Sequence, residues 1–209
     1  MGGAFVDHAA GAQADAVTGL AGERLELEPE PLLVIQGAYD VVNVTAGDGP
    51  RVVASAAGET SAVTNVLRAQ RAGGALVLQL HPRCTLDVTV PRGTAVRLRV
   101  AKSRSSVAGV DDVDVFSAKG SLRLHDVGGR VRIRSAKEDI EVALSAQRET
   151  RDVSVMMAKG KFVLTVPAAR GGVYRVDAAK THVSVPPSVE GGVPVRVRAA
   201  RSEIAIRAA

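Results

Sequence analysis

The chain has 209 residues, of which 46% are hydrophobic, 23% are charged and only 2% are aromatic. This content of Val, Leu and Ala excludes intrinsic disorder for most of the chain, and no apolar run approaches the roughly 20 residues of a transmembrane helix. Cys84 is the only cysteine, which excludes a disulfide scaffold. The scarcity of Phe, Tyr and Trp argues against a domain that binds nucleic acid by stacking bases.

Residues 1–22 are rich in Ala and Gly and show no apolar period, so we expect a flexible tail there. This segment lacks the basic start and the continuous apolar core of a signal peptide. The cytoplasm is therefore the expected compartment.

From Arg24 onward, apolar residues recur at every second position, which is typical of half-buried strands. We expect an irregular N-terminal β region over residues 23–91. Its predicted strands cover residues 32–35, 41–45, 51–54, 76–80 and 86–90, and residues 63–70 fit either a strand or a helical turn.

Residues 92–209 contain six copies of one pattern, in which two alternating strands flank a small-residue turn that carries a cation. The copies read VRLRVAKSRSSV from Val96, VDVFSAKGSLRL from Val113, VRIRSAKEDIEV from Val131, VSVMMAKGKFVL from Val153, VYRVDAAKTHVSV from Val173 and VRVRAARSEIAI from Val195. The turn cations are Lys102, Lys119, Lys137, Lys159, Lys180 and Arg201, with spacings of 17, 18, 22, 21 and 21 residues.

A repeat near 20 residues with two short strands per unit is typical of a β-solenoid. Each coil would turn its apolar alternates inward, as in Val113 and Val115 with Leu122 and Leu124. We therefore predict one all-β solenoid domain, in which the repeats continue the N-terminal β region. A β-sandwich of hairpins is the alternative, because its strands also alternate.

The stretch LDVTVPRGTAVRLRV, followed by the repeats, resembles the bacterial putative-adhesin domains of unknown function. Those domains carry a V-x-V-P-x-G motif followed by coils, and the similarity covers about residues 32–206. The resemblance implies a β-helical fold and no catalytic residues. This chain departs from the pattern because its turns read Ala-Lys in place of Ser-Gly-Asp-Ile. A weaker likeness to bactofilins, which polymerise end to end, concerns the architecture alone.

Charged residues are distributed unequally along the chain. Residues 1–91 hold five Arg and ten Asp or Glu, whereas residues 92–209 hold 22 Lys or Arg and 12 Asp or Glu. Seven arginines occupy outward strand positions in the repeats, namely Arg97, Arg99, Arg132, Arg134, Arg175, Arg196 and Arg198. Three explanations stay open: a solvated outer face, attraction between acidic and basic parts of two copies, and binding of an anionic polymer along a cationic ridge. We expect Glu138, Asp139 and Glu203 to offset part of the turn charge.

No residue pattern indicates an enzyme, a cofactor or a metal site. The four histidines lie far apart in the sequence, and Cys84 has only His81 nearby. Asp111, Asp112 and Asp114 form an acidic cluster, but Asp is common in turns for backbone reasons. Of Met156 and Met157, one is expected to face the core and the other the solvent.

The repeat that ends the chain has no predicted cap, so Ile204 and Ile206 are expected to form an exposed assembly edge. The leading hypothesis is a non-enzymatic structural protein that self-associates through solenoid ends into a homo-oligomer or filament. The alternative is a module that binds an anionic polymer, such as nucleic acid, an anionic glycan or lipid head groups, through the six turn cations.

Overall fold

The computed structural model describes residues 16–38, 40–58 and 65–209, and every regular element in them is a strand of one sheet. The predicted all-β class is confirmed. Most of the expected tail lies outside the described residues, but β1 (Ala16–Leu20) pairs with β6 (Asn65–Ala72), so these residues are strand and not tail. Among the described residues, no helix is long and apolar enough to cross a membrane.

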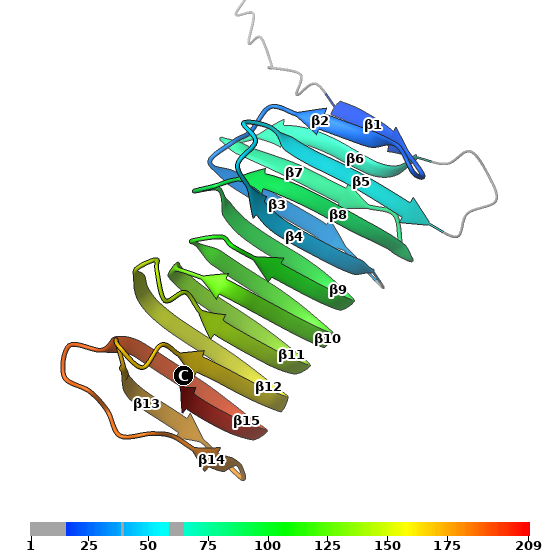
Figure 1. Cartoon of the computed structure of the whole chain (residues 1–209). Helices are drawn as coiled ribbons and strands as arrows, with labels where there is room; N and C mark the ends of the chain where they lie inside the picture. Colours follow the sequence, from blue (N-terminus) through cyan, green and yellow to red (C-terminus); the bar gives the residue numbers. More distant parts are fainter. Residues whose placement is uncertain (1–15, 39, 59–64) are drawn as a thin grey trace, which may run out of the picture.

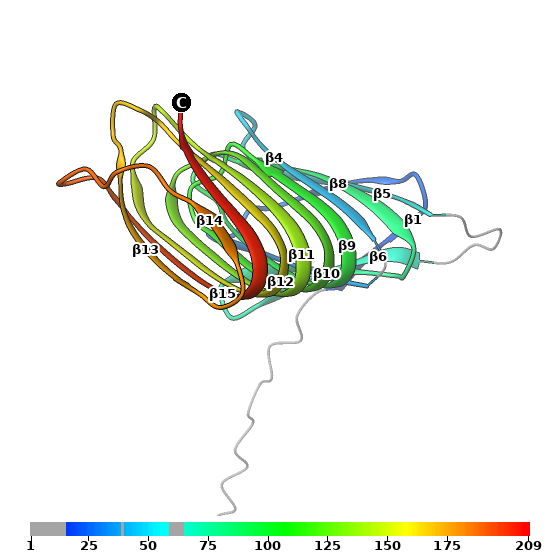
Figure 2. The ribbon, with the colours of Figure 1, turned by 90° about the horizontal axis from the view of Figure 1, so that it is seen from below.

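Five long strands form the regular part of the sheet: β9 (Ala95–Ala108), β10 (Val113–Val127), β11 (Gly129–Leu144), β12 (Thr150–Val166) and β15 (Val193–Ala208). They run parallel and in register, so equivalent residues of the repeats lie side by side. Figure 2 shows the strands curved and nested behind one another. In each strand the alternation of buried and exposed residues is interrupted at the turn cation, where the direction of the side chains changes. We call the part before the turn cation the first arm and the part after it the second arm.

A further pair of strands precedes the repeats. β3 (Leu32–Gly37) pairs with the first arm of β9, and β4 (Val41–Gly47) pairs with its second arm. The two strands therefore extend the two arms of the repeats by one further layer, with β3 ending at Gly37 and β4 beginning at Val41. Because the sequence between them contains no Ala-Lys pair, the repeat pattern does not reveal this layer.

Beyond β3 and β4 the two arms separate. The first arm continues through β7 (Ala75–Leu80) to β6 and β1, and the second through β8 (Cys84–Pro91) and β5 (Val52–Gly58) to β2 (Arg24–Leu27). Several of these ladders are antiparallel, so the sheet is mixed and does not close on itself. All five strands predicted between residues 32 and 90 overlap observed strands, and the ambiguous segment is strand from Asn65 onward.

The core lies between the arms, and the predicted inward residues occupy it. Val113, Val115, Leu122 and Leu124 are all buried, and Phe162 is the largest of the fully buried side chains. Small aliphatic side chains suit this space because the two arms face each other closely across it.

The predicted assembly edge is wrong, because β15 is an interior strand. It lies between β12 on one side and both β13 (Gly172–Ala178) and β14 (His182–Ser184) on the other. Ile204 and Ile206 are accordingly 0% and 4% exposed. The stack ends instead at β13 and β14, as Figure 1 shows.

The composition of the two coils explains this order. β15 offers an unbroken alternation of Val and Ile on both arms, which fits a position covered from both sides. β13 and β14 are short, are separated by a turn in which Lys180 has a φ of 51°, and leave Val173 and Val183 exposed. Terminal repeats are commonly atypical in this way, since only one of their faces is covered.

Candidate binding surface

The turn cations form one row along the bend of the sheet. Lys119 lies opposite Lys102 and Lys137, and the ladder continues through Lys159 to Arg201. Ala178 lies opposite Ala199 and His182 opposite Glu203, which places Lys180 beside Arg201. All six side chains are exposed, and neighbours along such a row lie about 4.8 Å apart at the backbone. We call these six residues the turn row.

Glycines follow the turn row in two of the strands, whereas Ser103, Glu138 and Ser202 stand at this position in β9, β11 and β15. Gly120 and Gly160 have φ values of 144° and 130°, which other residues rarely adopt. A Cβ atom on Gly120 would lie 1.7 Å from the carbonyl oxygen of Ser103 on the neighbouring strand. The backbones approach so closely here that any side chain would push the strands apart.

The outward side of the first arm carries the seven arginines predicted there. One ladder position reads Arg97, Asp114, Arg132, Ser154, Arg196 and Arg175 across the strands in space. The other reads Arg99, Phe116, Arg134, Met156, Arg198 and Asp177. We call these two rows and the turn row the cationic face.

The cationic face has a large excess of positive charge. Its only carboxylates are Asp114, whose Oδ2 lies 3.0 Å from Nε of Arg97, and Asp177. The outward side of the second arm differs, because opposite charges are interspersed there. Arg123 pairs with Glu141 at 3.6 Å, and Lys161 pairs with Glu203 at 3.3 Å. The positive charge of the repeats is therefore concentrated on one side of the sheet.

Two large apolar side chains lie exposed within the cationic face. Phe116 is 61% exposed and Met156 is 51% exposed, whereas Met157 is buried as expected for one of the two methionines. Phe116 stands between Arg99 and Arg134 in the ladder. The sequence signal for this outward position was the alternation itself, since Phe116 lies between the inward residues Val115 and Ser117.

Glu138 does not offset the turn row from outside, contrary to expectation, because its side chain points inward and is 2% exposed. Ser117 donates a hydrogen bond to its Oε2, and its Oε1 has no hydrogen-bond partner among the described residues. Burial raises the pKa of Glu138, an effect that the hydrogen bond from Ser117 only partly opposes.

A second buried carboxylate occupies the equivalent bend between β3 and β4. Asp40 accepts a hydrogen bond from the backbone N–H of Cys84 at 3.1 Å, and its own carbonyl accepts one from Arg104. Burial raises the pKa of Asp40 as well, although backbone hydrogen bonds such as that from Cys84 lower it. The interior of the bend thus holds carboxylates beneath a cationic exterior.

The acidic cluster at residues 111–114 ties neighbouring connections together. Arg151 binds both oxygens of Asp112, at 2.6 and 2.8 Å, and the backbone N–H of Arg130 donates to the same carboxylate. Burial raises the pKa of Asp112, but these donors outweigh burial and hold it below its usual value. Asp111 lies 3.6 Å from Arg148. Across the described residues, no three His, Cys, Asp or Glu side chains are grouped so as to hold a metal ion.

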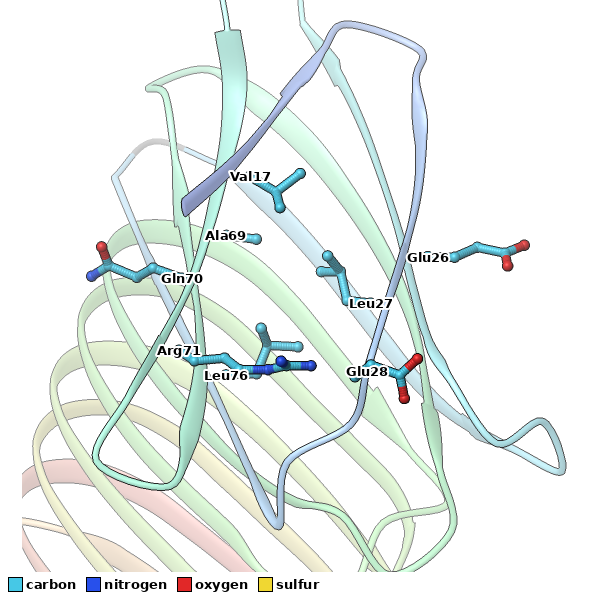
Figure 3. A pocket seen from close by; sticks show the side chains of 8 residues that line it. All are labelled: Val17, Glu26, Leu27, Glu28, Ala69, Gln70, Arg71 and Leu76. Carbon is cyan, nitrogen blue, oxygen red and sulfur yellow. The ribbon is translucent and has the colours of Figure 1, made fainter. Parts of the chain in front are cut away.

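The N-terminal end of the stack has a hollow of about 260 Å³ between the two arms. Figure 3 shows Val17 and Leu27 pointing into this space, while Glu26 points away from it. Arg71 is held at the rim by an ion pair with Glu30 at 3.3 Å. This end therefore presents apolar side chains with a charged rim.

No protein-family model and no curated protein matches this chain. Among solved structures, a putative cell adhesion protein from Clostridium sporogenes is similar over 90% of this chain and all of its own, with 8% identity and a TM-score of 0.57. A putative adhesin from Bacteroides fragilis covers 90% of this chain and 97% of its own at 11% identity, with a TM-score of 0.43. The expected likeness to putative adhesins is confirmed for the fold: this is an all-β protein with the fold of such proteins.

Proposed function

We propose that this chain is a non-enzymatic interaction protein whose cationic face binds an anionic macromolecule. The observation that carries the proposal is the register of the sheet, which gathers thirteen cations and only two carboxylates into three neighbouring rows. The fold shared with a putative cell adhesion protein supports a role in binding rather than catalysis.

Electrostatics supports this assignment. Unit charges at the ~4.8 Å spacing of a ladder repel by roughly 1 kcal/mol per pair in water, and by more where solvent is displaced. Solvent and salt relieve part of this repulsion, and a polyanion would relieve it while releasing counterions. If the charged residues served only to keep the surface hydrated, positive and negative charges could be mixed on both arms.

The test compares two triple charge reversals in the full chain. Lys119→Glu, Lys137→Glu and Lys159→Glu lie in the turn row, while Arg123→Glu, Lys161→Glu and Arg207→Glu change the net charge equally on the second arm. Binding to fluorescent heparin or polyphosphate is measured by anisotropy across a salt series. We expect the turn-row variant to lower the slope of log K against log salt by about three. Equal losses in both variants would refute a role for this face.

Self-association through the ends is the second candidate, because both ends of the stack have exposed apolar residues on strands with one open edge. β1 and β2 pair only with β6 and β5, and β13 and β14 pair only with β15. The exposed large hydrophobics outside the cationic face lie at these ends: Val17, Leu20, Val173, Val183 and Val189. Unpaired edges with such residues favour pairing with another copy.

Sedimentation velocity across a concentration series, at low and high salt, tests this candidate. Growth at both salts that is abolished by Val173→Lys with Val183→Lys would support assembly through the β13–β14 end. A monomer at every concentration would exclude it. Growth at low salt alone would instead indicate attraction between the acidic and basic parts of two copies.

We further infer that the stacked repeats act as coils of a β-solenoid scaffold. Its support is the parallel, in-register pairing of five successive long strands around one apolar interior. The cytoplasm remains the expected compartment, and fractionation of cells that express the tagged protein would test it.

A further inference from the structure

The cationic face is two-dimensional. Along the stack, six ladder positions at ~4.8 Å span roughly 24 Å, and along the strands the distance from the Arg97 row to the turn row is roughly 16 Å. A single linear polymer would contact one row at a time and leave the others solvated. A flat anionic surface can contact cations of more than one row at once.

Apolar residues lie between the cations of this face. Phe116 and Met156 alternate in one ladder row with Arg99, Arg134 and Arg198. Between this row and the turn row runs a line of exposed small residues: Ala101, Ala118, Ala136, Ala158, Ala179 and Ala200. A hydrated polyanion would satisfy the cations but would leave Phe116 and Met156 without an apolar partner.

We propose that the cationic face docks on an anionic lipid bilayer, with Phe116 and Met156 entering the boundary between head groups and acyl chains. The flanking arginines and the turn row would bind lipid phosphates, and the long Lys and Arg stems allow their charges to stay at head-group level. This combination of apolar insertion and cationic attraction is the one that holds amphipathic surfaces on membranes. The inference rests on the proposed function and adds the nature of the partner.

The absence of Trp from the chain permits a direct test. Phe116→Trp places a single indole in the face, and Val183→Trp places one at an exposed position of β14, away from it. On addition of vesicles of phosphatidylglycerol and phosphatidylcholine, we expect the emission of the indole at position 116 to shift to the blue and to be quenched by brominated acyl chains. The indole at position 183 should show neither change.

Vesicle flotation with the unlabelled protein supplies the second readout. Wild type should float with anionic vesicles and not with pure phosphatidylcholine vesicles. Phe116→Ser with Met156→Ser should weaken flotation by about tenfold or more, while heparin binding is retained. The matched control, Val163→Ser, removes an apolar group from the outward side of the second arm and should bind as wild type. Thermal unfolding followed by circular dichroism verifies that the variants are folded.

The outcomes of these experiments distinguish the membrane inference from the proposed function. Binding to heparin without binding to anionic vesicles would overturn the membrane inference and leave the proposed function standing. Vesicle binding without any change in the emission at position 116 would also overturn it, since the face would then not insert. Failure to bind either partner would overturn both.

Discussion

At the scale of single residues, Glu138 shows most clearly that the position in the fold, and not the residue type, decides whether a side chain is buried. Glu138 follows Lys137 directly in the chain. The side chain of Lys137 is exposed, whereas that of Glu138 is among the most buried polar groups described. The residues that follow the turn row in β9 and β15, Ser103 and Ser202, are buried as well, so the bend turns this position toward the interior. A carboxylate at this point is therefore desolvated and only partly hydrogen-bonded.

This burial gives the stability a defined pH dependence. Because the pKa of Glu138 is raised above its ordinary value of 4.5, the folded state binds its proton more tightly than the unfolded state does. Its contribution is most favourable below pH 4.5 and is lost as the pH rises through the folded-state pKa. We expect Glu138→Gln to be more stable than wild type at neutral pH, with a smaller difference at about pH 4, as measured by urea unfolding. A difference that does not vary with pH would contradict this.

At the scale of elements, the connections between the long strands are held by side chains that reach across coils. Arg148, which lies between β11 and β12, donates to the carbonyl oxygens of Gly109 and Asp126. It also binds the Asp126 carboxylate at 2.6 Å and lies near Asp111. One guanidinium thus links three successive connections, which the repeat pattern did not reveal because these connections differ in length and sequence.

We predict that Arg148→Ala lowers the free energy of unfolding by about 1 to 3 kcal/mol, because two carbonyls lose their donor. Arg148→Lys should recover little of this, since an ammonium cannot reproduce the forked geometry of the guanidinium. Urea unfolding of both variants measures the effect. Arg123→Ala on the second arm, whose ion pair with Glu141 is exposed, is the control and should change stability by less than about 1 kcal/mol. Full recovery in the Lys variant would contradict the predicted role.

At the scale of the whole molecule, the order of the strands decides which residues can meet a partner. Chain order would place β15 at the end of the stack, whereas β13 and β14 occupy that place. At this end of the stack the residues proposed for self-association therefore belong to β13 and β14, and the turn row runs from Lys159 to Arg201 and only then to Lys180.

This strand order can be tested with two neighbours in one ladder. Ile204 is fully buried and lies opposite Val183, which is 41% exposed. Ile204→Asp should lower the free energy of unfolding by about 3 kcal/mol or more, because it places an unpaired charge in the core. Val183→Asp should cost less than about 1 kcal/mol. Thermal and urea unfolding distinguish the two, and comparable losses would contradict the observed order.

Sequence patterns alone predicted the strands of the repeats, their inward residues and the alignment of five turn cations. Each of these depends on a period-two alternation and on copies of one pattern, which are local properties of the chain. The outward position of Phe116 follows from the same rule.

Long-range contacts set the order of β12, β15 and β13, the inward direction of Glu138, and the pairing of β3 and β4 with the two arms of β9. Coils with the same alternation can stack on one another in more than one order, so no local pattern selects among these orders. The choice is made by long-range packing, which covers the more apolar coil on both sides and leaves the broken, more polar one at the end.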